Sequence, residues 1–235
     1  MSNYPRAKTV IECPLCKREA FETTTRHALF KQNINKCISC EYAYFTFSND
    51  ADANKKSVQK DNSNSFGMNK ARNEYYVKLF KKIDNRIDLS GIIEIGTPKD
   101  FNFLKRIHET RKDVDIYSHD ILENNFPEYI KFSTSLDFFR DKQIDLLFCI
   151  HTLEHIPIDE LVEFVKFCKN VFKFFIFEVP CCETEIRIQQ STTQPHYSFF
   201  TEKSIRRLFG DSIEVEKTEK ILKFNNLPFK LYGKE

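Results

Sequence analysis

Residues 92–120 alternate between short apolar runs and one helical pattern, and this order constrains the fold more than any other part of the sequence. An apolar run at 92–95 ends at Gly96, and a helical pattern follows. A second apolar run at 114–117 leads to Asp120. Glycine lets backbone approach a ligand closely, a helix start offers free N–H groups, and a distant acid can bind ribose hydroxyls. The pattern therefore predicts a strand, turn, helix and strand that bind a nucleoside.

The same alternation continues along the chain. Apolar runs predict five strands, at 91–95, 114–118, 129–132, 144–149 and 174–179. Helical patterns begin near residue 69, cover 101–110 with Asp100 as the N-cap, cover 157–172, and follow Thr201. An antiparallel hairpin is predicted from 213–217 and 222–232. Together these elements predict an α/β protein with a Rossmann-like doubly wound sheet and a C-terminal antiparallel hairpin.

The ligands of a doubly wound sheet bind at the carboxyl ends of its strands. Gly96, Asp120 and Ser133 each follow a predicted strand, and residues 149–152 end the fourth one. We therefore expect these residues to line one crevice.

Several segments resemble class I methyltransferases, which use S-adenosylmethionine. Glu94-Ile-Gly96 is similar to their first motif, and Asp120 is similar to their ribose-binding acid. Residues 145–155, which end in Leu-Glu-His, are similar to their fourth-strand motif. The resemblance covers about residues 69–235 and implies S-adenosylmethionine as the cofactor. It implies cofactor contacts for Glu94, Gly96, Thr97, Asp120, Ile121, Ser133, Cys149 and His151.

Two pairs of cysteines precede this region. Cys13 and Cys16 form one pair and Cys37 and Cys40 the other, with 20 residues between the pairs. This is the spacing of a four-thiolate zinc site, because two cysteines that close together can present both sulfurs to one tetrahedral ion. Two disulfides are the alternative, which a cytosolic location disfavours. Four thiolates complete the coordination shell, so the predicted zinc has a structural role.

Composition along the chain predicts three parts. Residues 1–48 form a zinc ribbon, residues 49–68 form a linker almost without apolar side chains, and residues 69–235 form a methyltransferase-like domain. Short strands are predicted within the ribbon at 21–25, 28–30 and 42–47. A unit of this length has little core of its own, so we expect the metal to supply much of its stability.

Histidine is the natural proton acceptor for methyl transfer, because its side chain titrates near neutral pH. His155 follows the fourth strand, beside the expected position of the methyl group. His196 lies in 196–201, which resembles the segment after the fifth strand of the family. We predict that both are catalytic, and the alternative is that each is a hydrogen-bonded structural residue.

His151 to His155 also match His-x-x-Glu-His, a pattern of some zinc proteases. That site needs both histidines on one stable helix. Here a predicted strand leads directly into the motif and Pro157 follows two residues later. The placement disfavours a metalloprotease.

A zinc ribbon in front of a Leu-Glu-His methyltransferase resembles enzymes that methylate nucleotide-linked sugars or related small metabolites. We therefore predict a small, sugar-containing acceptor. Residues 1–48 have a formal charge of +3 and residues 49–72 of +2, whereas the remainder has −3. A slightly acidic catalytic part disfavours nucleic acid as the partner.

Two alternatives stay open. Some ribosomal RNA methyltransferases also carry a front zinc ribbon. The other alternative is a methyltransferase-like fold that binds a partner without catalysis. Pro98 and Asp100 support it, because they stand where the family has small residues. The first 15 residues lack a signal-peptide core, and no apolar run approaches the ~20 residues of a membrane helix. We therefore expect a cytoplasmic protein, with its oligomeric state open.

Overall fold

A computed structural model describes residues 12–19, 21–29, 33–44 and 70–232, and the structural statements below concern these residues. The predicted linker at 49–68 lies outside them.

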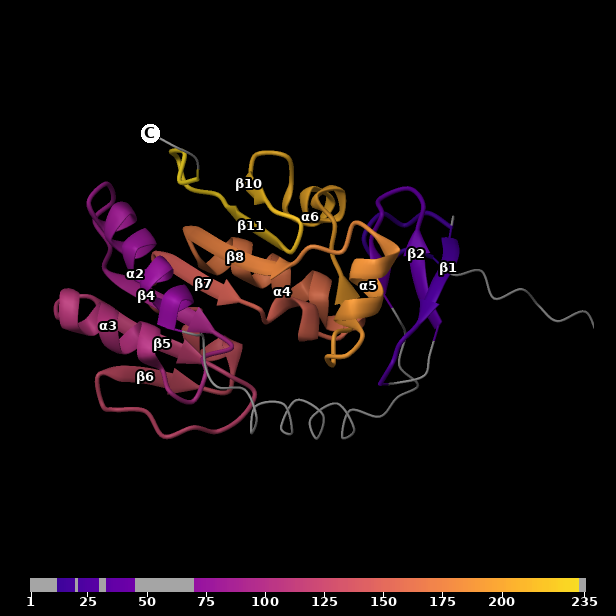
Figure 1. Cartoon of the computed structure of the whole chain (residues 1–235). Helices are drawn as coiled ribbons and strands as arrows, with labels where there is room; N and C mark the ends of the chain where they lie inside the picture. The colour runs from indigo at the N-terminus through magenta and orange to yellow at the C-terminus, as the bar shows by residue number, and fades with distance from the viewer. Residues whose placement is uncertain (1–11, 20, 30–32, 45–69, 233–235) are drawn as a thin grey trace, which may run out of the picture.

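The larger of two sheets has seven strands in the order β10–β11–β8–β7–β4–β5–β6 (Figure 1). They are β4 (Gly91–Ile95), β5 (Asp115–His119), β6 (Ile130–Ser133), β7 (Leu146–Ile150), β8 (Phe174–Pro180), β10 (Glu214–Lys217) and β11 (Ile221–Asn225). The strands from β4 to β8 are parallel, and β11 and β10 extend the β8 edge in antiparallel pairing. The predicted Rossmann-like sheet with its closing hairpin is confirmed.

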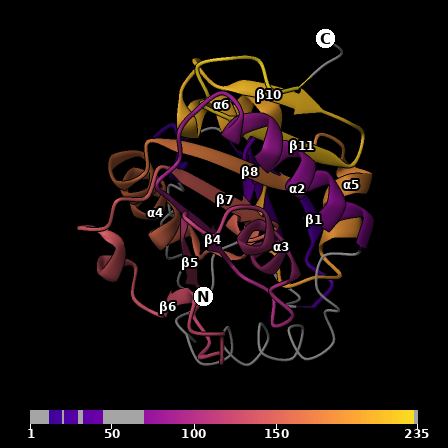
Figure 2. The same ribbon diagram turned by 90° about the vertical axis from the view of Figure 1, so that its left-hand side faces the viewer.

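Helices cover both faces of this sheet. On one face lie α2 (Lys70–Asp84) and α3 (Asn102–Thr110), and on the other lie α4 (Ile158–Val171) and α6 (Glu202–Phe209) (Figure 2). Every residue of β4 and β7 is buried as a result. Strands covered on both faces need apolar side chains on both, which explains why their sequences are continuous apolar runs.

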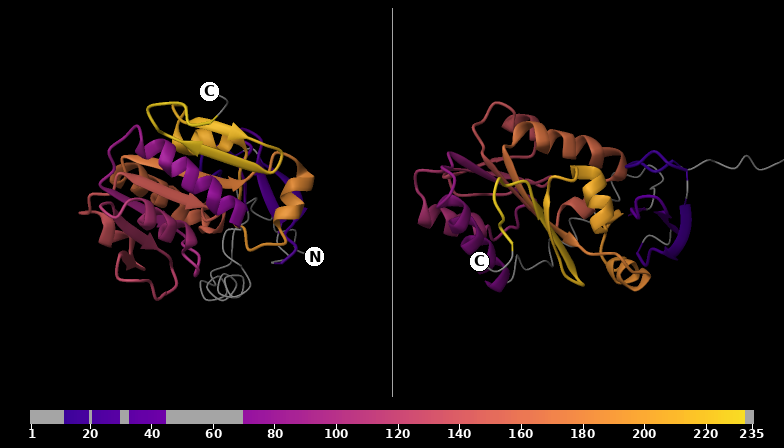
Figure 3. Two further views of the ribbon diagram at one scale, coloured as in Figure 1. Left: turned by 60° about the vertical axis from the view of Figure 1, so that its left-hand side comes forward. Right: turned by 90° about the horizontal axis from the view of Figure 1, so that it is seen from above.

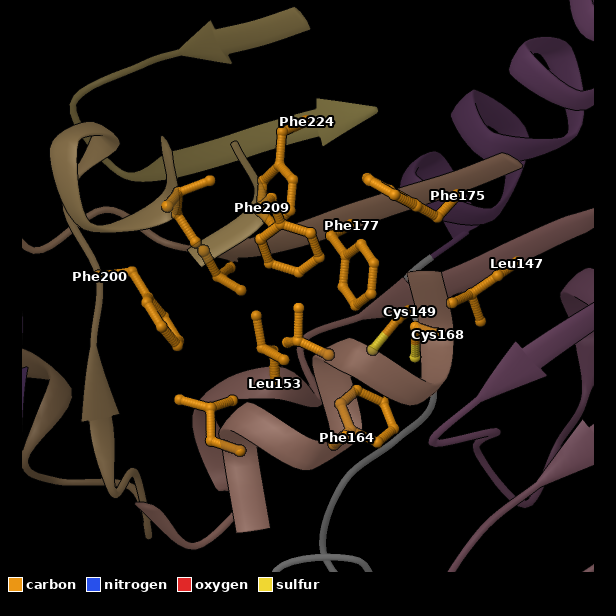
Figure 4. Close-up of a cluster of buried hydrophobic side chains, with 14 of the residues drawn as sticks. Leu147, Cys149, Leu153, Phe164, Cys168, Phe175, Phe177, Phe200, Phe209 and Phe224 are labelled. Carbon is orange, nitrogen blue, oxygen red and sulfur yellow. The ribbon is translucent and has the colours of Figure 1, made fainter. Parts of the chain in front are cut away.

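Phenylalanine fills much of the core under α4 and α6. Figure 4 shows Phe177, Phe209 and Phe224 close together, with Cys149 and Cys168 beside them. The rings of Phe177 and Phe224 are stacked, with centroids 5.2 Å apart. These contacts hold β8, β11 and α6 together without any tryptophan in the chain.

A second sheet of four strands lies beside the cysteine pairs, and Cys37 ends one of its strands. Its order is β1 (Phe21–Arg26), β2 (Asn33–Cys37), β3 (Ala43–Tyr44) and β9 (Ser198–Phe199). We call β1 to β3 with the cysteine loops the ribbon, which lies at the end of the molecule opposite α2 and α3 (Figure 3). β9 follows α5 (Glu185–Ser191) in the chain and pairs antiparallel with β3. The ribbon therefore completes its sheet with a strand from the C-terminal part of the chain.

Two predictions about the ribbon and the first α/β turn are wrong. Ala28 and Leu29 lie in a turn instead of a strand, because the ring nitrogen Nδ1 of His27 accepts a hydrogen bond from the backbone N–H of Leu29. Asp100 does not cap α3. Its carboxylate accepts a bond from the Asn102 side chain, and the N-cap position belongs to Phe101, whose φ is 35°.

The closing hairpin is shorter than predicted. β11 ends at Asn225, whose side-chain oxygen accepts a hydrogen bond from the backbone N–H of Leu227. The side-chain oxygen of Asn226 accepts one from the backbone N–H of Phe175. These bonds turn the chain out of the sheet, so residues 226–232 continue without strand pairing.

Candidate functional site

The turn after β4 meets the loop after β7 at Gly96. Gly96 has a φ of 79°, and a Cβ atom there would lie 1.9 Å from Oγ1 of Thr152. The same hydroxyl donates to the carbonyl oxygen of Ile95, 3.2 Å away. Glycine is therefore required at this position by both its backbone angle and its contact with the neighbouring loop. The two segments that sequence motifs singled out are thus packed against each other.

Glu94 is fully buried beside this turn. Burial, with Asp100 and Asp120 nearby, raises the pKa of its carboxyl to about 8. Among the described residues, its Oε2 has no hydrogen-bond partner. Oγ1 of Thr97 donates to the backbone carbonyl of Glu94 and accepts from the Ser118 hydroxyl. Thr97 therefore fixes the backbone of Glu94, while the carboxyl is protonated at neutral pH and has one oxygen available to a ligand.

Asp120 and Ile121 follow β5, and Ser133 is the last residue of the neighbouring strand β6. One carboxylate oxygen of Asp120 accepts a bond from the backbone N–H of Leu122, while burial raises the pKa of this side chain. Ile121 is 52% exposed. The hydroxyl of Ser133 bonds the backbone of Ser135. The structure thus places all three at the same sheet edge as Gly96.

Cys149 differs from the other predicted cofactor residues. Its thiol is fully buried in the phenylalanine core, and burial raises its pKa well above the usual value. Because the side chain faces the core (Figure 4), only the backbone at this position is left for a cofactor contact.

His151 lies between two buried acids that the sequence analysis left out of the site. Its Nδ1 lies 3.1 Å from Oε1 of Glu154, and its Nε2 lies 3.0 Å from Oε1 of Glu178, an ion-pair distance without hydrogen-bond alignment. Burial lowers the pKa of His151, but these carboxylates outweigh it and raise the pKa to about 9. The ring is therefore a cation at neutral pH.

Glu178 is held further by a 2.7 Å hydrogen bond from the Tyr76 hydroxyl and by Arg72, whose Nε lies 3.5 Å from it. A sequence signal for it existed, since Glu178 is the one charged residue of an apolar strand. An acid in such a run is buried and needs partners.

His155 and His196 come together with Glu154. The two rings contact edge to face, with centroids 4.7 Å apart. Nδ1 of His155 donates to the carbonyl oxygen of Pro195, so its Nε2 carries the lone pair when the ring is neutral. Burial, with His155 adjacent, lowers the pKa of His196 to about 3. Both predicted catalytic histidines thus share one cluster with a buried carboxylate.

The four cysteines of the ribbon also converge. The sulfurs of Cys13 and Cys40 are 3.6 Å apart and those of Cys16 and Cys37 are 3.5 Å apart. These distances exceed the ~2.05 Å of a disulfide bond and are close to the ~3.8 Å between thiolates on one tetrahedral zinc. The four thiols are free of disulfides, and the donor set fits one zinc ion.

A groove of about 680 Å³ lies between the ribbon and α6. Its lining includes Cys16 and Cys40 but none of the predicted cofactor residues and neither of the histidines predicted to be catalytic. The basic side chains Lys203 and Arg206 in its wall pair with Glu41 and Glu202. The groove therefore offers mixed charge instead of a basic surface.

No family model and no curated protein matches the sequence. Solved structures do match. The plantazolicin methyltransferase BpumL, in complex with a desmethyl-plantazolicin analogue and S-adenosylhomocysteine, is 11% identical with a TM-score of 0.55, covering 74% of this chain and 91% of its own. The N-methyltransferase NodS from Bradyrhizobium japonicum WM9, in complex with S-adenosyl-l-homocysteine, is 11% identical with a TM-score of 0.50, covering 74% and 95%.

Among the described residues, no helix combines the length and apolar character needed to cross a bilayer. The sheet order, the helices on both faces and the similar structures all indicate the same fold. The chain has the Rossmann-like fold of class I methyltransferases.

Proposed function

We propose that the protein is an S-adenosylmethionine-dependent methyltransferase. The observation that carries the proposal is the convergence of Gly96, Asp120 and Thr152 at one edge of the sheet, where a doubly wound fold binds its ligand. The two similar structures described above are of methyltransferases bound to S-adenosylhomocysteine, which supports it.

In this proposal the cofactor lies across the carboxyl ends of β4, β5 and β6. Asp120 accepts hydrogen bonds from the ribose hydroxyls, and Glu94 uses its free Oε2 for a donor group of the cofactor. Exposed Ile121 and the nearby Ser133 border the base. Thr97, in the loop after β4, and His151, in the loop after β7, border the opposite end. The sulfonium supplies an activated methyl group, so these residues have to bind and orient it.

The acceptor side is assigned to the cluster of His155 and His196. The Pro195 carbonyl fixes the His155 ring so that Nε2 carries the lone pair, which can accept a proton or bind a cation. Glu154 lies behind the rings at 4.0 Å from His196 Nε2. The cluster can thus orient an acceptor and neutralise positive charge.

For the acceptor we propose a small molecule, with a nucleotide-linked sugar as the favoured class. The formal charge of −3 after residue 72 opposes a long polyanion. The mixed charge of the groove beside α6 gives no continuous basic surface either. Tight binding of RNA with a steep salt dependence would instead favour the ribosomal RNA alternative.

We also propose that Cys13, Cys16, Cys37 and Cys40 hold one structural zinc ion. Their convergence and lack of disulfides support it. A four-thiolate shell leaves no open position for chemistry.

Calorimetric titration with S-adenosylmethionine tests the function. We expect one site, and we expect Asp120→Ala to weaken binding by about 1.5–3 kcal/mol, roughly 10- to 150-fold, because hydrogen bonds to a charged group are lost. The matched control is Asp137→Ala, an exposed acid paired with Arg140, which should bind as the wild type does. Absence of binding at millimolar cofactor would contradict the proposal. Binding without methyl transfer to any sugar nucleotide or RNA would favour the non-catalytic alternative.

A further inference from the structure

We propose a second metal site in this protein, formed by Glu154, His155 and His196 and occupied by one divalent first-row transition ion. The three side chains offer one carboxylate oxygen and two imidazole nitrogens that all lie within 4.8 Å of one another. The site is chemically distinct from the four-thiolate ribbon and shares no residue with it.

The backbone brings the three ligands together before any ion binds. Glu154 and His155 belong to the short 3-10 helix η2 (Leu153–His155) after β7, whereas His196 precedes β9. The N–H of Tyr197 donates to the carbonyl oxygen of Glu154 at 2.8 Å. This bond joins segments that are far apart in the chain, directly beside the three side chains.

Buried atoms without partners indicate that a ligand is missing from the cluster. Glu154 is 0% exposed, and its Oε2 has no hydrogen-bond partner among the described residues. Nδ1 of His196, whose residue is 7% exposed, also has none. Leaving such groups unsatisfied destabilises a folded protein, and a charged carboxylate does so more than a neutral group. Their direct contact, 4.0 Å between Glu154 Oε1 and His196 Nε2, is too long for a hydrogen bond.

Neighbouring groups orient the ligands as they do around bound metals. Histidines that bind metal donate their other ring N–H to a carbonyl or carboxylate, and the carboxylate ligands are themselves hydrogen-bonded. Here His155 donates from Nδ1 to the Pro195 carbonyl at 3.1 Å, which leaves Nε2 for an ion. Oε1 of Glu154 is bonded to His151 at 3.1 Å, which leaves Oε2.

The donor set selects the class of ion. Two imidazoles and one carboxylate suit Mn²⁺, Fe²⁺, Co²⁺ or Zn²⁺, whereas Ca²⁺ and Mg²⁺ prefer oxygen ligands alone. Bonds of ~2.1 Å place neighbouring ligand atoms about 3–3.5 Å apart, so the widest pair, within 4.8 Å before binding, approaches by up to about 1.3–1.8 Å. Three protein ligands leave open coordination positions, unlike the closed set of four thiolates.

Titration with Mn²⁺, followed by electron paramagnetic resonance of the free ion, tests the proposal on the full chain with zinc already bound to its thiolates. Mn²⁺ prefers oxygen and nitrogen ligands, so it leaves the cysteine site alone. We expect one bound Mn²⁺ per chain. Glu154→Gln and His155→Gln should each weaken it at least about tenfold. Matched controls are Glu160→Gln and His108→Gln, which lie outside the cluster and should bind like the wild type.

Thermal unfolding with and without Mn²⁺ keeps the test valid if a variant is less stable. A bound ion raises the unfolding temperature of the wild type and of both controls, but not that of the cluster variants. His155 is only partly buried, so His155→Gln should fold even if Glu154→Gln does not. No Mn²⁺ bound to the wild type, or binding that His155→Gln leaves unchanged, would overturn the proposal.

Discussion

Glu94 makes the stability of the protein depend on pH in an unusual direction. Its pKa is about 8 in the folded chain because of burial, against 4.5 for an ordinary glutamate. Between these two values the folded state binds more protons than the unfolded state does, so the free energy of unfolding decreases as pH rises. The stabilising effect is complete below pH 4.5 and is lost as pH rises through 8.

Glu94→Gln removes this dependence, since glutamine has a similar shape and no charge. We expect the variant and the wild type to unfold at similar denaturant concentrations near pH 4.5. The variant should become more stable than the wild type as pH rises, by roughly 3–5 kcal/mol at pH 9. Urea unfolding across this range measures the difference. Glu123→Gln, at an exposed position, is the control. A difference in unfolding free energy between Glu94→Gln and the wild type that does not grow with pH would contradict the raised pKa of Glu94.

At the scale of elements, the contact between the β4 turn and the β7 loop depends on a missing side chain. A methyl group on Gly96 would overlap Thr152. An alanine at this position would also have to adopt a left-handed backbone conformation. Gly210 at the end of α6 has a positive φ too, 98°, but a Cβ atom there would meet nothing within 4 Å.

We therefore expect Gly96→Ala to destabilise the protein more than Gly210→Ala. Backbone strain costs about 1–3 kcal/mol in both variants. Overlap with Thr152 adds about 1–3 kcal/mol in the first variant only. Equilibrium unfolding of the two single variants measures the total cost of each. Unfolding of the double variant Gly96→Ala with Thr152→Ala measures how much of the cost comes from the overlap. If the double variant recovers none of the excess loss, the overlap is not its cause.

Elements that bury both faces were predictable from sequence, and elements that depend on distant partners were not. The range 91–95 agrees residue for residue with β4, because an apolar run ended by glycine has few other readings. β9 has two residues and exists only because β3 lies beside it. Ala28 and Leu29, expected in a strand, form a turn because of a local hydrogen bond to His27. Likewise, motifs predicted site roles for Gly96, Asp120 and the histidines. The contact of Glu178 with His151 depends on the pairing of β7 with β8, which no local motif shows.

At the scale of the whole molecule, the ribbon is connected to the histidine cluster. β9 begins two residues after His196 and pairs with β3. Just before β3, the Tyr42 hydroxyl oxygen lies 2.5 Å from the Ser198 hydroxyl oxygen. The ring nitrogen Nε2 of His27 bonds the carbonyl oxygen of His196 at 3.1 Å. The ribbon therefore positions one side of the cluster.

Removing the proposed zinc ion from the ribbon with a chelator should loosen residues 197–200. Loss of the β3 pairing and the Tyr42 contact, each about 1 kcal/mol, predicts roughly tenfold or faster amide exchange there. Hydrogen–deuterium exchange measured by mass spectrometry detects the change, with β4 and β5 as internal controls because they pair only within the larger sheet. Unchanged amide exchange at 197–200 after complete zinc removal would contradict the claim that the ribbon positions the histidine cluster.

The pairing of β3 with β9 also sets an order of events during synthesis. Ala43 and Tyr44 leave the ribosome about 150 residues before Ser198 and Phe199. At ~5–20 residues per second this interval lasts roughly 10–30 s, and during it β3 has an unpaired edge. Unpaired edges recruit other chains into aggregates. In the proposed zinc-bound form the cysteine loops fold before β9 is made, and β9 later covers the free edge of β3. Metal supply to the nascent chain should therefore govern the yield of native protein.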